Sequence, residues 1–158
     1  MPEPLADQIM RKVKQAAALY YRLLLVVAPA SAGKTIALQD IRDRTGAPLV
    51  SVNLELCRQM LDLTERQRAL QLPRLLRDIV GNGDDEMILL DNTEVIFAVR
   101  LKQDPLRLLQ GLSRNKTVVA AWNGALTEDS LTYAAPTHPE YRCYPKRDLL
   151  VASLEATT

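Results

Sequence analysis

Continuous apolar runs alternate with helical patterns along the chain. Residues 23–27, 87–90 and 117–122 are almost entirely apolar, which is typical of short strands buried on both faces of a parallel sheet. Two less continuous apolar stretches, at 48–53 and 149–154, predict two more strands. Because helical segments separate these runs, we predict an α/β fold: a three-layer core with a mainly parallel sheet of about five strands and helices on both faces.

Start and stop signals for helices lie between the predicted strands. Gly46 supplies the left-handed residue that ends a helix, and Asp104 followed by Pro105 is typical of a helix start. Thr64 and Gln67 have the spacing of a capping box, which predicts a break between two helical segments. We therefore predict helices over 5–21, 34–44, 54–80 with the break at 63–64, 105–112 and 126–134.

The composition is that of one ordinary globular domain. With 158 residues, of which 47% are hydrophobic and 25% charged, the chain suffices for one core. We predict a single domain over 1–158, with an N-terminal helix in 1–21, an α/β core in 22–158 and no C-terminal lid domain. The apolar runs are far shorter than the ~18 residues of a membrane helix, and no secretory apolar region opens the chain. The expected location is the cytoplasm, with no membrane partner.

The stretch after the first apolar run has the outline of a phosphate-binding P-loop. The pattern requires Gly, four residues, then Gly-Lys-Ser/Thr, and here Ala28 takes the first place before Gly33, Lys34 and Thr35. Ala is tolerated at that place if its φ is negative. A buried strand before the loop and a helix after it direct the helix N-terminus toward an anion. The predicted nucleotide-binding residues are Ala28, Ser31, Ala32, Gly33, Lys34, Thr35 and Ile36.

The loop predicts ATP and Mg²⁺ as cofactors. The backbone N–H groups of 32–35 are expected to surround the β-phosphate, and Lys34 is expected to reach the β- and γ-phosphates. The Thr35 hydroxyl is a predicted Mg²⁺ ligand. The strand at 87–90 ends in Asp91, which is the arrangement in which a second protein oxygen holds Mg²⁺ in P-loop ATPases.

Two further residues after strands complete the predicted chemistry. In many ATPases a catalytic carboxylate directly follows the Asp that holds Mg²⁺, but that place holds Asn92, so Glu94 is the predicted general base. Asn123, at the end of the predicted strand 117–122, is the predicted sensor of the γ-phosphate or the attacking water. Carboxyl ends of parallel strands meet at one edge of a sheet, so these side chains are expected beside the P-loop. The sequence therefore predicts an ATPase that forms ADP and phosphate.

Arginines complete such sites from a neighbouring subunit, where they stabilise the charge on the transferring phosphoryl group. Arg114, which precedes a central strand, is the preferred candidate for this arginine finger, followed by Arg142 and Arg107. A finger supplied by a second copy requires an oligomer. We therefore expect a homo-oligomer, at least with nucleotide bound.

The net charge of +1 gives no global attraction for nucleic acid. Direct contact with DNA is therefore expected only from local basic patches. The basic residues cluster in three groups: Arg11, Lys12 and Lys14; Arg100, Lys102, Arg107, Arg114 and Lys116; and Arg142, Lys146 and Arg147.

The order of a P-loop strand, a strand ending in Asp and a strand ending in Asn resembles the AAA+ branch of the P-loop ATPases, which implies a sheet order of 5-1-4-3-2. Four stretches of the chain are similar to the BrxF family, small P-loop proteins of certain BREX bacteriophage-exclusion systems. They are 89–94 (LLDNTE), 104–110 (DPLRLLQ), 112–117 (LSRNKT) and 121–124 (AWNG). The likeness extends over about 6–154. It implies a bacterial cytoplasmic ATPase that works beside other BREX components, including a DNA methyltransferase, in distinguishing self DNA from phage DNA.

Three functions are open from the residues. The first is an ATPase that switches assembly or DNA engagement in phage defence. Ala28 and the absence of a carboxylate directly after Asp91 also fit an ATP-binding adaptor with little hydrolysis. Small-molecule kinases are compact P-loop proteins of this size too, but they usually supply a lid of catalytic arginines and a dedicated acceptor pocket.

Overall fold

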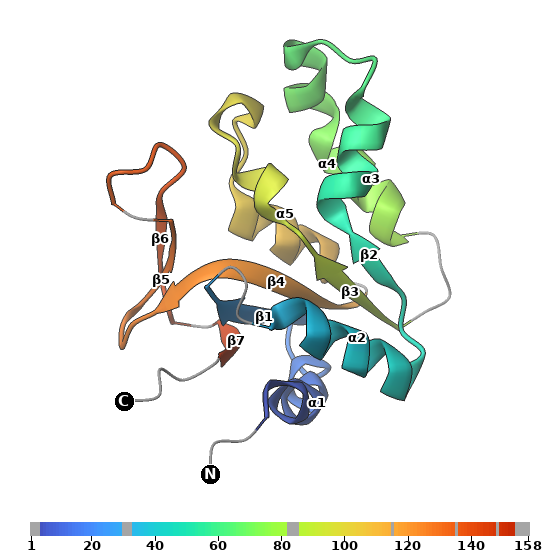
Figure 1. Cartoon of the computed structure of the whole chain (residues 1–158), viewed down its shortest axis with the longest axis vertical. Helices are drawn as coiled ribbons and strands as arrows, with labels where there is room; N and C mark the ends of the chain where they lie inside the picture. The colour runs from blue at the N-terminus through green and yellow to red at the C-terminus, as the bar shows by residue number, and fades with distance from the viewer. Residues whose placement is uncertain are drawn as a thin grey trace.

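The chain forms a layered α/β structure in a computed structural model that describes residues 4–29, 33–81, 86–114, 116–134, 136–147 and 149–153 (Figure 1). The helices are α1 (Leu5–Ala16), α2 (Lys34–Thr45), α3 (Val52–Met60), α4 (Glu65–Gly81) and α5 (Pro105–Leu112), with the short 3₁₀ helices η1 (Glu94–Phe97) and η2 (Val99–Leu101). The strands are β1 (Leu23–Ala28), β2 (Leu49–Ser51), β3 (Met87–Asp91), β4 (Thr117–Leu126), β5 (Ser130–Tyr133), β6 (Arg142–Pro145) and β7 (Leu150–Ser153).

Five strands lie side by side in the order β2-β3-β4-β1-β7, and each neighbouring pair is parallel. The second half of β4 pairs with β5, and β5 pairs with β6, both in the antiparallel direction. The predicted α/β class with a mainly parallel sheet is therefore confirmed. Counting β7 as the fifth parallel strand gives the order 5-1-4-3-2.

Helices cover both faces of this sheet. In Figure 1, α1 and α2 lie on one side of the strands, and α3, α4 and α5 lie on the other. All six residues of β1 are buried. Leu25 and Val27 belong to the core that α3 and α4 complete, whereas Leu24 and Val26 belong to the core that α1 and α2 complete. An uninterrupted apolar strand thus indicates a sheet with water on neither face.

Two predicted helix boundaries are confirmed by their hydrogen bonds. Gly46 has a φ of 77°, and its N–H donates to the Arg42 carbonyl at 2.8 Å, which closes α2. Before α4, the N–H of Thr64 donates to Gln67 Oε1 at 2.9 Å, and the N–H of Gln67 donates to Thr64 Oγ1 at 3.2 Å. This capping box separates α3 from α4. No helix within the described residues is long and apolar enough to cross a bilayer.

The N-terminal helix is shorter than predicted. It ends at Ala16, and turns follow in which the N–H of Ala18 donates to the Gln15 carbonyl and that of Leu19 to the Ala16 carbonyl. Leu19 and Tyr20 are exposed. Their apolar spacing therefore belongs to a surface turn and not to a packed helix face.

The helix predicted over 126–134 is wrong, because this segment forms a β-hairpin with β4. Leu131 and Tyr133 are buried, while the residues between and before them are only partly buried. A burial period of two is that of a strand. This alternation covers only the four residues of β5. It is too short to identify a strand from the sequence alone.

β4 is longer than the predicted strand 117–122, since it continues through Asn123 and Gly124 to Leu126. The parallel pairing with β1 ends at Asn123, and the antiparallel pairing with β5 begins at Gly124. A Cβ on Gly124 would lie 1.9 Å from the carbonyl oxygen of Thr132. Glycine therefore permits the close approach of β5 at this point.

Aromatic side chains pack the hairpin onto η1. The rings of Phe97 and Tyr133 stack with centroids 3.6 Å apart, and Trp122 meets Phe97 edge to face at 4.9 Å. On β6, the hydroxyl of Tyr144 donates to Asp104 Oδ1 at 2.8 Å, immediately before α5. The hairpin is thus attached both to η1 and to the start of α5.

Tyr133 is expected to make the folded protein less stable at alkaline pH. Burial is the main cause that raises the pKa of Tyr133 to about 12, and the carboxylates of Glu140 and Glu94 add to it. In the unfolded chain tyrosine ionises near pH 10, so above pH 10 the unfolded state loses the proton before the folded state does. We expect the free energy of unfolding to fall by about 2 kcal/mol between pH 10 and 12, measured by urea denaturation. Tyr133→Phe should remove that part of the decline, and an unchanged decline would contradict the assignment.

Candidate functional site

The carboxyl ends of β1, β3 and β4 meet at one edge of the sheet. β1 leads toward the N-terminus of α2, β3 ends at Asp91, and Ala28 pairs with Asn123 at the last parallel position of β4. A pocket of about 280 Å³ opens at this edge. The pocket is lined by Gly33, Lys34, Thr35, Ile36, Asp91, Asn92, Glu94 and Asn123.

The backbone at this edge explains the two small residues of the loop. Ala28 lies within β1, and it is not among the described residues with positive φ, so an alanine in place of the usual glycine carries no backbone strain. Gly33 has a φ of 90° and open space around the Cβ position, so it is required by its left-handed backbone. It precedes the first turn of α2. Ser31 and Ala32, which the sequence predicted to bind nucleotide, lie outside the described residues.

Lys34 folds back onto the start of the loop. The residue is only 6% exposed, and its Nζ donates to the carbonyl oxygens of Ala28 at 3.0 Å and Pro29 at 2.7 Å. Burial lowers the pKa of Lys34, while the carboxylates of Glu94 and Asp91 oppose that shift. An anion that enters the pocket competes with two neutral carbonyls for this ammonium group. Among the described residues no carboxylate lies within salt-bridge distance of Nζ, so this group can be transferred to a phosphate without breaking such a pair.

Thr35 and Asp91 place two oxygen atoms side by side. The Thr35 hydroxyl donates to Asp91 Oδ2 at 2.6 Å, and Asp91 is buried. A hydroxyl and a carboxylate are hard oxygen donors of the kind that Mg²⁺ prefers, and Mg²⁺ typically keeps only one or two protein ligands beside water and phosphate. Within the described ranges, no group of three or more His, Cys, Asp or Glu side chains could hold a metal. These two residues fit Mg²⁺ bound together with a phosphate.

The chain turns sharply after Asp91, and this turn places Glu94 at the pocket. Asn92 has a left-handed φ of 51°, a conformation that asparagine adopts more readily than most residues. Its N–H donates to Asp91 Oδ1 at 2.9 Å, and its side-chain amide donates to Ser51 Oγ on β2 at 3.0 Å. η1 begins two residues later at Glu94. The turn thus accounts for a carboxylate three places after the Asp instead of next to it.

Glu94 meets Asn123 across the pocket. The side-chain amide of Asn123 donates to Glu94 Oε1, so the two residues predicted to act on the γ-phosphate side are in direct contact. The hydroxyl of Thr93 donates to the Ala121 carbonyl at 2.6 Å, and Thr93 is buried. This bond ties the segment after β3 to β4, two residues before Asn123. Thr93 is not among the predicted site residues, although a hydroxyl between Asp91 and Glu94 at a strand end was the available signal.

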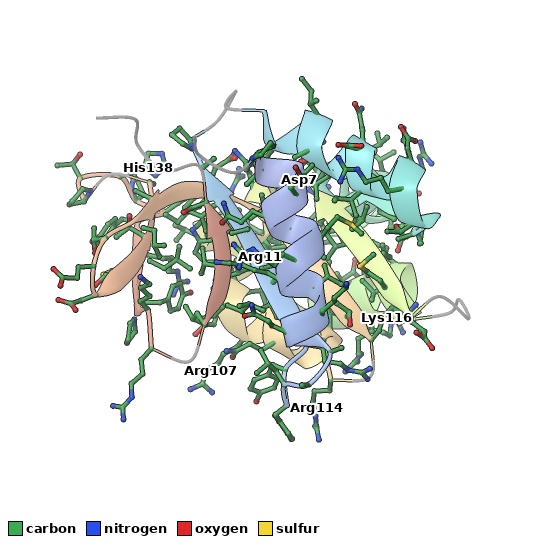
Figure 2. The ribbon with its side chains drawn as sticks, turned by 90° about the horizontal axis from the view of Figure 1, so that it is seen from below. Asp7, Arg11, Arg107, Arg114, Lys116 and His138 are labelled. Carbon is green, nitrogen blue, oxygen red and sulfur yellow. The ribbon has the colours of Figure 1, made fainter. Side chains whose placement is uncertain are left out.

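The preferred arginine finger lies at the other end of the sheet. Arg114 precedes the first residue of β4, whereas Asn123 lies toward its carboxyl end. Its guanidinium carbon lies 5.3 Å from the centroid of the Tyr20 ring. Figure 2 shows Arg114 where α1 ends. Arg114 therefore does not reach the pocket of its own chain, and a role across subunits stays a prediction.

The two other candidate arginines have contacts of their own. Arg142 on β6 donates from Nη2 to the Gln103 carbonyl at 2.7 Å, which helps to hold the hairpin. The Arg107 side chain is 85% exposed, with Nε 3.6 Å from Asp104 Oδ2. Arg107 is therefore the more accessible of these two guanidinium groups.

Two lysines of the basic clusters donate hydrogen bonds to backbone carbonyls of other elements of the fold. Lys116 is buried, and its Nζ donates to the Val80 carbonyl at 2.9 Å. Lys12 on α1 donates to the Val151 carbonyl on β7. The local basic patches proposed for DNA therefore have fewer exposed members than the sequence indicates.

A second cavity of about 400 Å³ adjoins the pocket. Pro29 and Asn123 line it on the loop side, and Tyr133, His138 and Glu140 line it on the hairpin side. His138 Nδ1 accepts from the N–H of Glu140 at 3.0 Å. This cavity was not predicted from the sequence, since part of the segment that forms it, 126–134, was expected to be a helix.

No protein-family model matches this chain, and no curated protein matches it in sequence. Its function is therefore inferred from the geometry of the pocket.

Proposed function

We propose that this chain is a P-loop ATPase of the AAA+-like type, which binds ATP and Mg²⁺ and hydrolyses ATP. One observation carries the proposal: Lys34, the Thr35–Asp91 pair and the Glu94–Asn123 pair line one pocket at the carboxyl edge of a parallel sheet. The sequence places these residues in three separate segments. Each has the chemical type that ATP hydrolysis requires at its position.

Binding is assigned to α2 and Lys34. The first N–H groups of α2 have no carbonyl partner within the helix and favour a negative charge, which supports placing a phosphate at its N-terminus. Lys34 then exchanges the carbonyls of Ala28 and Pro29 for phosphate oxygens. Thr35 and Asp91 are the residues that would hold Mg²⁺, which neutralises charge on the β- and γ-phosphates when bound.

Hydrolysis is assigned to Glu94 and Asn123. Glu94 accepts a proton from the attacking water, whose oxygen forms a bond to the γ-phosphorus while the bond to the bridging oxygen of ADP breaks. Asn123 holds the carboxylate of Glu94 and offers its amide to the attacking water or the γ-phosphate. Thr93 fixes the distance between these two side chains through its bond to Ala121.

Thr93→Val tests this positioning role. The variant keeps the shape of the side chain but loses the buried hydrogen bond, so we expect a loss of stability of about 1–2 kcal/mol. Because Glu94 is then less well fixed, kcat should fall about tenfold while ATP affinity stays within a factor of about two. Thr93→Ser should restore kcat. An equal change in kcat and KM, or no rescue by Ser, would contradict a positioning role.

Phosphate release from Mg-ATP tests the activity itself. We expect purified protein to form inorganic phosphate and ADP in equal amounts, with binding measured in parallel by calorimetry. Tight ATP binding with zero turnover would instead support the ATP-binding adaptor. That outcome would retain the binding residues and remove the catalytic roles of Glu94 and Asn123.

A small-molecule kinase is the second candidate, and the cavity beside Asn123 favours it. The cavity has a volume of about 400 Å³, and its lining includes Tyr133, His138 and Glu140. It is therefore large enough for a phosphoryl acceptor bigger than water. ADP formed in excess over inorganic phosphate after addition of a metabolite extract would support this function. An unchanged one-to-one ratio would support the ATPase.

The biological role proposed is an ATP-dependent switch or assembly component of a BREX phage-defence system. This role is supported by the pocket and by the resemblance to the BrxF family of the stretches around Asp91, Arg107, Arg114 and Asn123.

If the protein forms a homo-oligomer in which an arginine enters the neighbour's pocket, a slowly hydrolysed ATP analogue should increase the mass of the particles in mass photometry. ADP should not increase it. DNA contact should appear in fluorescence anisotropy at low salt and weaken steeply as salt rises. No binding of duplex or single-stranded DNA, with or without ATP, would assign DNA contact to another BREX component.

A further inference from the structure

A third cavity of about 520 Å³ lies between the α3–α4 pair and the two 3₁₀ helices. α3 packs against η1 and α4 packs against η2, on the side of the sheet where Figure 1 shows α3 and α4 next to each other. This volume is within the range of ligand-binding sites. The residues that line the cavity are Cys57, Met60, Leu61, Leu63, Glu65, Arg68, Val95, Ala98, Arg100 and Leu101.

Apolar side chains form the interior of the cavity and continue outside it. Met60 and Leu101 are buried in the wall, whereas Leu61 is 73% exposed and Val99, next to the lining residue Ala98, is 57% exposed. Leu54, which lies one turn before the lining residue Cys57 on α3, is also exposed. The apolar surface therefore extends past the cavity, unlike a pocket that encloses a small molecule.

Two guanidinium groups contribute positive charge from different walls. Arg68 on α4 donates from Nε to the Leu63 carbonyl at 3.1 Å, and Arg100 on η2 is exposed. Among the described residues, no carboxylate lies within salt-bridge distance of either group; Glu65, which also lines the cavity, pairs with neither. The charge that complements this surface is negative.

We propose that this cavity docks a peptide segment of a protein partner that presents apolar side chains next to carboxylates. The apolar side chains fill the space between α3–α4 and η1–η2 and cover Leu61 and Val99. The carboxylates pair with Arg68 and Arg100. A segment is favoured over a small molecule because the exposed side chains of Leu61 and Val99 extend the apolar surface beyond the buried wall at Met60 and Leu101.

Docking is also positioned to act on the pocket, a consequence that rests on the proposed ATPase function. Val95 and Ala98, which line the cavity, belong to η1 and the residue after it. η1 begins with Glu94, the predicted base. A segment packed against η1 would therefore change how Glu94 is held against Asn123.

The two cysteines provide a test that needs no ATP. Cys57 lines the cavity and is exposed, whereas Cys143 is exposed on β6 and outside the lining. Peptides selected from a displayed random library against the Cys143→Ser protein are expected to carry Asp or Glu beside Leu, Ile or Phe. They should slow the reaction of Cys57 with a thiol reagent at least tenfold. In the Cys57→Ser protein, the same peptides should leave the reaction of Cys143 unchanged.

The charge requirement is tested with arginine variants. The double variant Arg68→Gln, Arg100→Gln should weaken the selected peptides at least tenfold, while the matched variant Arg66→Gln, Arg74→Gln, which alters exposed arginines of α4 outside the lining, should bind as wild type does. If the first variant does not fold, salt dependence of binding to the unaltered protein replaces it, with weaker binding expected at high salt.

Four results would overturn the proposal. These are the absence of selected binders, binders that leave Cys57 reactive, protection of Cys57 by decanoate alone, and protection by higher protein concentration alone. The third would assign the cavity to a small amphipathic anion, and the fourth to a second copy of the chain. None depends on ATP turnover, so failure of the docking site and failure of the proposed ATPase are distinguishable.

Discussion

Glu94→Gln is expected to lower ATP turnover at least about 100-fold, the usual size of a general-base contribution, while ATP affinity changes less than about threefold. The amide keeps the shape of the side chain but cannot accept a proton from water. It still contacts Asn123, so the pocket should retain its form. Phosphate release under saturating Mg-ATP, with binding measured by calorimetry, checks both parts of the expectation.

Glu128→Gln is the matched control, since Glu128 is exposed in the hairpin turn between β4 and β5. Its turnover should equal that of the unaltered protein. Undiminished hydrolysis by Glu94→Gln would show that another group accepts the proton. The role given to the turn at Asn92 would then be wrong as well.

Lys34→Ala is expected to weaken ATP binding at least about 100-fold, because it removes the ammonium group that neutralises the β- and γ-phosphates. Turnover should be lost together with binding. Calorimetric titration with a slowly hydrolysed ATP analogue measures the effect without interference from hydrolysis.

The fold should survive this change, since burial disfavours the charged amine and lowers the pKa of Lys34. Circular dichroism should show an unaltered helix content. Lys14→Ala, at an exposed position of α1, should bind the analogue normally. Normal binding by Lys34→Ala would place the nucleotide elsewhere on the molecule.

The central sheet was predictable because its strands are buried on both faces. β1, β3 and the first half of β4 appear in the sequence as continuous apolar runs, and few other structures bury six successive side chains. The boundaries at Gly46 and Thr64 were predictable for a local reason: a left-handed glycine and a capping box form their bonds within a few residues.

The hairpin was not predictable from local pattern. β5 has only four residues, and it becomes a strand because β4 passes Gly124 without turning and offers it an edge. That pairing depends on the close approach of Gly124 to Thr132, which involves residues eight apart. Helical spacing in the same stretch was therefore overridden by tertiary contact.

The meeting of Asp91, Glu94 and Asn123 could be predicted, because parallel strands bring their carboxyl ends to one edge. The contacts among them could not. The bond from Thr93 to Ala121 and the folded-back position of Lys34 depend on the register of β3 and β4 and on the path of the loop, which residue types alone do not fix.

Trp122 gives this protein an optical reporter of its own site. It is the single tryptophan of the chain, it is fully buried beside Asn123, and its indole N–H donates to the Thr132 carbonyl at 3.1 Å. Phe97 of η1 packs on one side of the indole, and Tyr144 of β6 lies near it. A shift of η1 or of the hairpin therefore changes the emission of one fluorophore, and stopped-flow mixing can follow nucleotide-induced rearrangement in the unlabelled protein.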